Sequence, residues 1–129
     1  MITAYLVGIS THYEGEDIEI RYRIYENDEL VVEKSRLEEY VKPAIVNHTA
    51  LMILFREFDK KKEEQIIVYM NDPAINDQIR GVTQTKNRDV LKASRITREA
   101  LNKSSNSIMI KDVSKDKEAL ERWNQEIEF

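Results

Sequence analysis

The sequence of 129 residues contains no cysteine, three glycines and two prolines. The lack of cysteine excludes a disulfide framework, a thiolate nucleophile and a metal site with cysteine ligands. So few glycines and prolines leave little room for flexible linkers, and no internal repeat or low-complexity tract is present. We therefore expect one folded domain over residues 1–129, a length within the usual single-domain range of about 100–150 residues.

The chain also lacks a long apolar run and an excess of positive charge. Its longest apolar stretches, residues 44–46 and 50–55, are far shorter than the ~20 residues that cross a bilayer. Residues 1–10 contain no legible signal peptide, so we expect a soluble, cytoplasmic protein without membrane contact. The net charge of −4 provides no overall cationic field that would attract nucleic acid.

Hydrophobic periodicity predicts three strands in the first third of the chain. Apolar and charged residues alternate over residues 18–24, which is typical of an antiparallel strand with one packed face. A buried apolar run precedes this strand at residues 5–9, and residues 30–34 follow it after an Asn27-Asp28 turn. We predict a three-stranded meander.

The remainder of the chain predicts helices alternating with strands. Pro43 starts a helix that reaches about residue 58, and residues 66–70 form a short apolar strand. Asp72 is the predicted N-cap of a helix with Pro73 in its first turn. The last three predicted elements are a helix over residues 88–102, a strand over residues 108–113 and a helix capped by Ser114. The order βββαβααβα predicts an α/β fold in which helices cover a five-stranded mixed sheet.

This order of elements resembles the ribonuclease H-like fold across nearly the whole chain. Residues 47–51 are similar to the first-helix segment in which an asparagine precedes the family's catalytic glutamate. Residues 66–72 are similar to the fourth strand with its terminal aspartate. Residues 86–91 are similar to the start of the helix beside the basic handle of the bacterial enzymes.

The resemblance implies cleavage of phosphodiester bonds with two Mg²⁺ ions about 4 Å apart, held by several carboxylates. The corresponding positions, in chain order, are Gly8, Ala50 or Leu51, Asn71 or Asp72, and Leu120. Only Asp72 is a carboxylate, and its expected role as an N-cap already accounts for it. We therefore expect vacated catalytic positions, a vestigial Asp72, no metal and no cofactor. The predicted protein is not an enzyme but a catalytically inactive binding or scaffold module.

Two alternatives stay open. The first is a nuclease with a rearranged site, which would use Asp72, other acids and Mg²⁺ or Mn²⁺. The second is a protein-interaction or homodimer domain, joined through the sheet edge or through the last helix with Trp123, Ile127 and Phe129. The simplest role of Trp123 is to dock on the sheet. The sequence identifies neither the partner nor the oligomeric state.

Charge is concentrated at residues 78–103, where seven basic and two acidic residues give +5 and leave −9 for the rest of the chain. Arg88, Lys92 and Arg95 follow i, i+4, i+7 spacing and share one helix face. The predicted phosphate contacts to nucleic acid are Lys86, Arg88, Lys92, Arg95 and Arg98. The alternative is a solvated helix face, because no aromatic stacking platform accompanies these charges in the sequence. Whether the basic helix faces the vacated cleft is not visible from the sequence.

The two histidines, His12 and His48, have no partner that the sequence proposes for acid–base chemistry. We predict that His48 lies at the surface or boundary of its helix.

Overall fold

The computed structural model describes residues 1–11 and 13–129, so His12 lies outside the described residues. The strands are β1 (Ile2–Ile9), β2 (Ile18–Glu26), β3 (Glu29–Glu38), β4 (Gln65–Met70) and β5 (Ser107–Asp112). The helices are the 3-10 helix η1 (Pro43–Ile45), α1 (Val46–Glu57), α2 (Ile75–Arg80), α3 (Arg88–Lys103) and α4 (Lys117–Glu126). Apart from the short η1, this is the predicted order of elements.

The strands form one mixed sheet in the order β3-β2-β1-β4-β5. Strands β1 to β3 pair antiparallel, whereas β4 runs parallel to both β1 and β5. The alternation in β2 has the expected cause, because Ile18, Ile20 and Tyr22 are fully buried on one face while Glu19 and Arg21 keep partial contact with solvent. The predicted five-stranded mixed sheet is confirmed.

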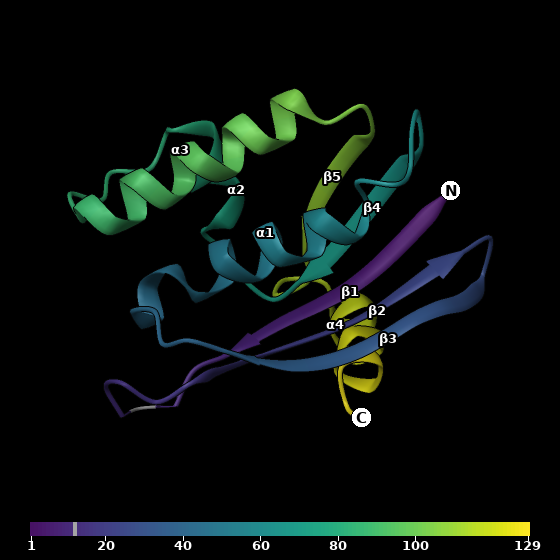
Figure 1. The fold of residues 1–129 in the computed structure, drawn as a ribbon, viewed down its shortest axis with the longest axis horizontal. Helices are drawn as coiled ribbons and strands as arrows, with labels where there is room; N and C mark the ends of the chain where they lie inside the picture. Colours follow the sequence, from purple (N-terminus) through teal and green to yellow (C-terminus); the bar gives the residue numbers. More distant parts are fainter. Residues whose placement is uncertain (12) are drawn as a thin grey trace.

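Helices cover both faces of the sheet (Figure 1). The α1 helix fills one face with Ala50, Leu51 and Leu54, all fully buried. The α3 helix contacts α1 and α2, which places it in an outer layer. Among the described residues, no helix is long and apolar enough to cross a membrane.

The α4 helix packs on the opposite face of the sheet, behind the strands in Figure 1. Trp123 is buried there, and its indole N–H donates a hydrogen bond to the carbonyl oxygen of Leu6 at 2.9 Å. The predicted docking of Trp123 on the sheet is confirmed. The predicted cap of this helix is wrong, because Asp116 accepts the N–H of Ala119 as N-cap, whereas Ser114 closes a turn earlier in the chain.

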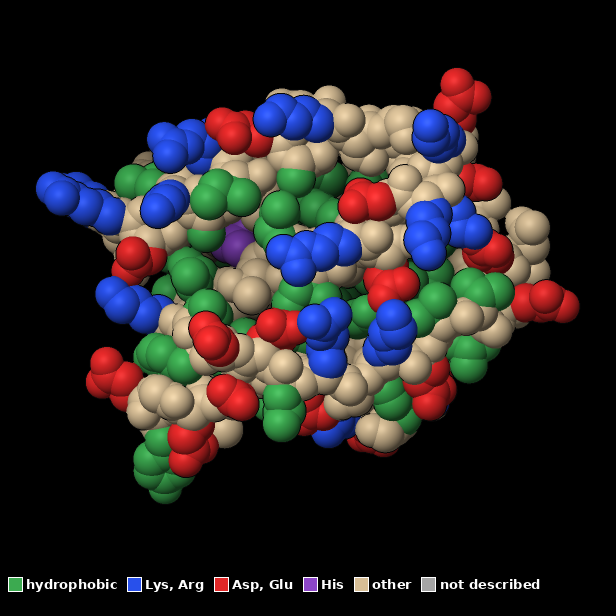
Figure 2. All heavy atoms as spheres, in the orientation of Figure 1, with side chains coloured by type: hydrophobic (Ala, Val, Ile, Leu, Met, Phe, Trp, Pro, Cys, Tyr) green, Lys and Arg blue, Asp and Glu red, His purple; other side chains and the backbone are tan. Residues whose placement is uncertain are grey.

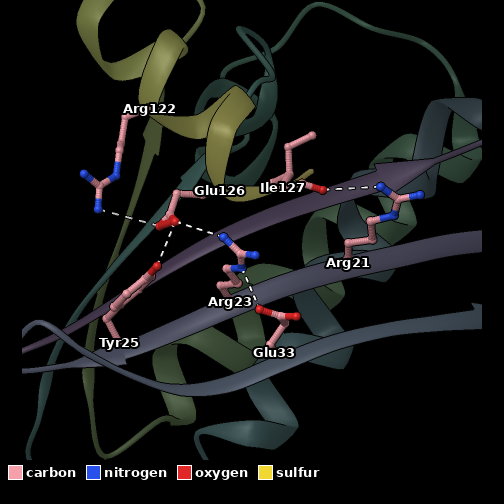
Figure 3. A network of polar contacts seen from close by, with 7 residues as sticks. All are labelled: Arg21, Arg23, Tyr25, Glu33, Arg122, Glu126 and Ile127. Carbon is pink, nitrogen blue, oxygen red and sulfur yellow. Dashed lines mark hydrogen bonds and ion pairs between the residues drawn. The ribbon is translucent and has the colours of Figure 1, made fainter. Parts of the chain in front are cut away.

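A buried carboxylate fastens α4 to the sheet (Figure 3). Glu126 is 6% exposed, and its Oε1 accepts hydrogen bonds from the hydroxyl of Tyr25 at 2.7 Å and from Nη1 of Arg23 at 3.2 Å. Its Oε2 has no hydrogen-bond partner among the described residues, and Nη2 of Arg122 lies 3.7 Å away. Because an unpaired charge is costly to bury, the hydrogen bonds that Glu126 accepts from Arg23 and Tyr25 fix the position of α4 on β2.

Candidate nucleic-acid interface

The end of β1 meets the start of α1 at Gly8. A Cβ atom on Gly8 would lie 2.6 Å from Cγ1 of Val46 and 3.3 Å from the side-chain oxygen of Asn47. Contacts below 3.0 Å are essentially absent for real Cβ atoms, so this position has no room for a side chain. At the first position that the resemblance assigns to a catalytic carboxylate, α1 therefore occupies the space of a side chain.

Asp72 follows the end of β4 and contacts Asn47, which also lies near Gly8, and both carboxylate oxygens of Asp72 have hydrogen-bond partners. Oδ2 accepts from the amide of Asn47 at 2.9 Å, and Oδ1 accepts the backbone N–H of Ala74 at 2.9 Å. The predicted helix start at Pro73 is wrong, because this turn comes first and α2 begins only at Ile75. Asp72 thus closes a turn ahead of the helix instead of capping it.

Asp112, at the end of β5, is a second carboxylate here that the sequence analysis missed. Its Oδ1 accepts the backbone N–H groups of Asp72 at 3.2 Å and of Ser114 at 2.9 Å. Its Oδ2 accepts the hydroxyl of Ser114 at 2.6 Å. The parallel pairing of β4 with β5 brings the two acids together, and only a correct strand order could have predicted this.

The remaining vacated positions lie in three different environments. Ala50, on α1, is fully buried in the core, and Leu120 packs half-buried in the cluster around Trp123. Asn71 is exposed. These three side chains therefore do not converge on Asp72 as a ligand set would.

The residues described do not fit a site for two Mg²⁺ ions. Within residues 1–11 and 13–129, no three His, Asp or Glu side chains lie together so that they could hold a metal ion. Two divalent cations need several free carboxylate oxygens, whereas those of Asp72 and Asp112 are already engaged by protein hydrogen-bond donors. We therefore derive no hydrolytic step through a metal at this position.

The basic helix α3 begins with a well-formed cap. The side-chain oxygen of Asn87 accepts the N–H groups of Asp89 and Val90, at 2.9 and 3.2 Å. Three residues, Val90, Ser94 and Thr97, form its buried stripe. The exposed cations at and just before its N-terminal half are Lys86, Arg88, Lys92 and Arg95. Figure 2 shows Lys and Arg side chains in blue along the edge of the molecule formed by α3.

Arg98 differs from these four cations. It is half-buried, and its Nη1 donates a hydrogen bond to the carbonyl oxygen of Ile79 at 2.8 Å. This bond ties the C-terminal end of α2 to α3. Arg98 therefore has a structural role that the charge pattern did not reveal.

The start of α3 lies at the same end of the molecule as Gly8. Nζ of Lys42, just before η1, is 2.8 Å from Oδ2 of Asp89, and this ion pair lowers the pKa of Asp89 and raises that of Lys42. Because η1 contacts α3 and leads directly into α1, whose first residues contact Gly8, the N-terminal end of α3 and the end of β1 lie at the same end of the molecule.

A buried polar cluster around His48 holds α3 in this position. His48 is 3% exposed, so the prediction of a surface or boundary residue is wrong. Its Nδ1 lies 2.9 Å from the hydroxyl of Thr97 on α3, and its Nε2 lies 2.8 Å from the amide oxygen of Gln78 on α2. Burial lowers the pKa of His48, which favours the neutral ring. Three helices thus share one hydrogen-bonded side chain.

Comparison with solved structures identifies the fold. The ribonuclease H1 of Halobacterium salinarum NRC-1 superposes with a TM-score of 0.71 at 17% identity, covering 94% of this chain and 98% of that one. LC11-RNase H1, solved in complex with an RNA/DNA hybrid, gives 0.65 at 19% identity, covering 98% and 96%. The N-terminal RNase H domain of a Mycobacterium tuberculosis protein gives 0.68 at 15% identity, covering 98% of each chain. No protein-family model and no curated sequence matches the chain.

The chain therefore has the ribonuclease H-like fold, as its resemblance implied. The expectation that it is not an enzyme is contradicted, because these structural neighbours are ribonucleases H. The expectation of inactivity depended on missing carboxylates, which do not by themselves establish that the protein lacks activity.

We expect Gly8→Ala to destabilise the protein by about 1–3 kcal/mol, because the new methyl group overlaps Val46. The free energy of unfolding in urea, followed by Trp123 fluorescence, measures the effect. In a Val46→Ala background the same substitution should cost clearly less. Equal costs in the two backgrounds would show that the contact with Val46 is not the cause.

We expect stability to fall as the pH drops below about 6.5. The unfolded chain binds a proton on His48 near its ordinary pKa of 6.5, whereas the buried ring in the native state has a lowered pKa and stays neutral longer. The contribution of the neutral His48 ring to the free energy of unfolding is complete above pH 6.5. It is lost as the pH falls toward the lower native pKa, with a slope of at most about 1.4 kcal/mol per pH unit. Urea unfolding of wild type and His48→Gln between pH 7.5 and 5.5 measures it. The variant should show a flatter profile, and parallel profiles would refute this role.

Proposed function

We propose that this protein is a ribonuclease H-type protein whose ligand is an RNA–DNA hybrid, bound through phosphates by the N-terminal half of α3. The observation that carries the proposal is the row of exposed cations Arg88, Lys92 and Arg95 on one face of α3. The fold adds support, because one structural neighbour was solved with an RNA/DNA hybrid. Contacts to phosphate position a duplex without reading its base sequence.

The four free cations make this face suitable for a polyanion. Lys86, Arg88, Lys92 and Arg95 have no ion-pair partner within residues 1–11 and 13–129, and Asp89 between them is already paired with Lys42. Binding of phosphates therefore does not require existing ion pairs to break. Phosphate binding releases counterions from the duplex, so the affinity for the hybrid falls steeply as the salt concentration rises.

The double variant Arg88→Glu, Arg95→Glu should bind a short RNA–DNA hybrid at least tenfold more weakly than wild type at low salt. Fluorescence anisotropy over a range of salt concentrations measures both the affinity and its slope against log salt. Loss of two phosphate contacts should reduce that slope by about 2.

A control with the same charge change is Lys60→Glu, Lys62→Glu, in the exposed turn before β4. This variant should retain most of the wild-type affinity. If both double variants weaken binding equally, the net charge and not the α3 face controls the interaction. If wild type does not bind the hybrid at low salt, the proposal is wrong.

Hydrolysis of the RNA strand is a second candidate, favoured by the ribonuclease identity of the structural neighbours. Incubation of a labelled hybrid with Mg²⁺ or with Mn²⁺, resolved by gel electrophoresis, tests it. We expect any cleavage to disappear when EDTA is added. It should also disappear in Asp72→Asn, because Asp72 is the one carboxylate at a position that the resemblance assigns to a catalytic acid. Cleavage that persists in this variant would assign the activity to other residues or to a contaminant.

A further inference from the structure

The face of the sheet opposite α3 carries an aromatic cluster that hybrid binding does not use. Tyr5 on β1, Tyr25 on β2 and Tyr69 on β4 meet beside α4. Together with Thr3, Asp28 and Arg122 they line a cavity of about 210 Å³, here called the tyrosine pocket. The sequence did not predict this aromatic cluster, because the three tyrosines are far apart in the chain and meet only when their strands pair.

The rings of the tyrosine pocket are arranged as a stacking surface. Tyr5 and Tyr69 are stacked, with centroids 5.3 Å apart and an interplanar angle of 16°. Tyr25 meets Tyr5 edge-on at 6.0 Å and 88°. The hydroxyl of Tyr25 is held by the buried carboxylate of Glu126, so this ring is fixed before any ligand arrives (Figure 3). Tyr69 remains half-buried, which leaves part of its ring accessible.

Two cations flank these rings. Arg122 is exposed, and its guanidinium carbon lies 6.0 Å from the centroid of Tyr5. Its ion pair with Glu126 spans 3.7 Å, longer than a hydrogen bond, so the guanidinium can turn toward a ligand. Lys111 is exposed and pairs in register with Tyr69, so both side chains project from the same face of the sheet. One cation is thus available on each side of the stacked pair.

The chemistry of the pocket selects a small planar group that carries a nearby negative charge. Its volume is below the roughly 300–1,000 Å³ of pockets that enclose drug-sized ligands, so it suits a single ring system. Aromatic side chains that stack bases, with Arg or Lys beside them for phosphates, are the general means of binding unpaired nucleotides. Asp28 at the rim supplies an acceptor for an exocyclic amino group.

We propose that the tyrosine pocket binds an unpaired nucleobase of a single-stranded nucleic acid. The base extends the Tyr5–Tyr69 stack, and its flanking phosphates contact Arg122 and Lys111. This site is independent of the α3 face, because the sheet separates the two (Figure 1).

The proposal is tested by fluorescence anisotropy, in which the full chain is titrated into labelled oligoadenylates of six nucleotides, made as RNA and as DNA. Wild type should bind, and Tyr69→Ala should bind about tenfold more weakly, because stacking on one aromatic ring is lost. Tyr69→Phe retains the ring and should keep nearly wild-type affinity. Arg122→Gln should reduce the slope against log salt by about 0.7, as expected for one phosphate on a single strand.

Two controls make the result specific. Tyr13→Ala removes a tyrosine that is 71% exposed and does not line the pocket, so it should leave binding unchanged. The variant Arg88→Glu, Arg95→Glu should still bind the oligonucleotides even where it fails to bind the hybrid, which separates this proposal from the proposed function. Trp123 fluorescence reports whether each variant is folded.

Several outcomes would overturn the proposal. These are the absence of wild-type binding, equal loss in Tyr13→Ala and Tyr69→Ala, weakened binding in Tyr69→Phe, or loss of binding only in the α3 variant. Binding of a proline-rich peptide in place of the oligonucleotides would assign the pocket to protein recognition. Binding of either RNA or DNA supports the proposal, since the stacked base and the phosphates are common to both.

Discussion

The close approach of α1 to the end of β1 determines the geometry of the strand-end region. Because Gly8 has no Cβ, Val46 occupies the space that a side chain at this position would need. The approach also places the amide of Asn47 on Asp72, whose other oxygen closes the turn that leads into α2. A carboxylate at residue 8 and the observed position of α1 therefore exclude each other, so the arrangement found here depends on a single missing methyl group.

The position of α3 depends in turn on buried polar contacts as well as on apolar burial. Its buried stripe contains one apolar residue, Val90, beside Ser94 and Thr97. Partly buried Ala100 and Leu101 add apolar contacts near its C-terminal end, and the hydrogen bonds around His48 orient the helix along its middle. The same side chain contacts Gln78 on α2, which couples the helix with the exposed cations to the two helices beneath it. Displacement of His48 would thus move the cationic face relative to the strand ends.

The sequence predicted the features that local patterns encode. Alternation in β2 and the i, i+4, i+7 spacing on α3 are properties of one element, and both could be recognised without a structure. Burial of His48 could not, because α1 is apolar on nearly all sides and gives no single face on which a polar residue stands out. The tyrosine pocket and the meeting of Asp72 with Asp112 depend on which strands are neighbours, which is a property of the whole sheet. The error about enzymatic class had another origin, since missing carboxylates at three of four positions were taken as evidence about activity.

The charge distribution gives the two proposed surfaces different physical characters. Residues 78–103 carry +5 within a chain of −4, so the α3 face attracts a polyanion more strongly than the rest of the molecule does. At physiological ionic strength the Debye length is about 8 Å, and the duplex then responds mainly to the cations it touches. Stacking on Tyr5 and Tyr69 adds a contribution that is not electrostatic to the few phosphate contacts there, whereas the α3 face binds through phosphate contacts alone, which weaken steeply with salt. Rising salt should therefore shift the balance of binding from the duplex face toward the single-strand face, a behaviour that a single cationic surface would not show.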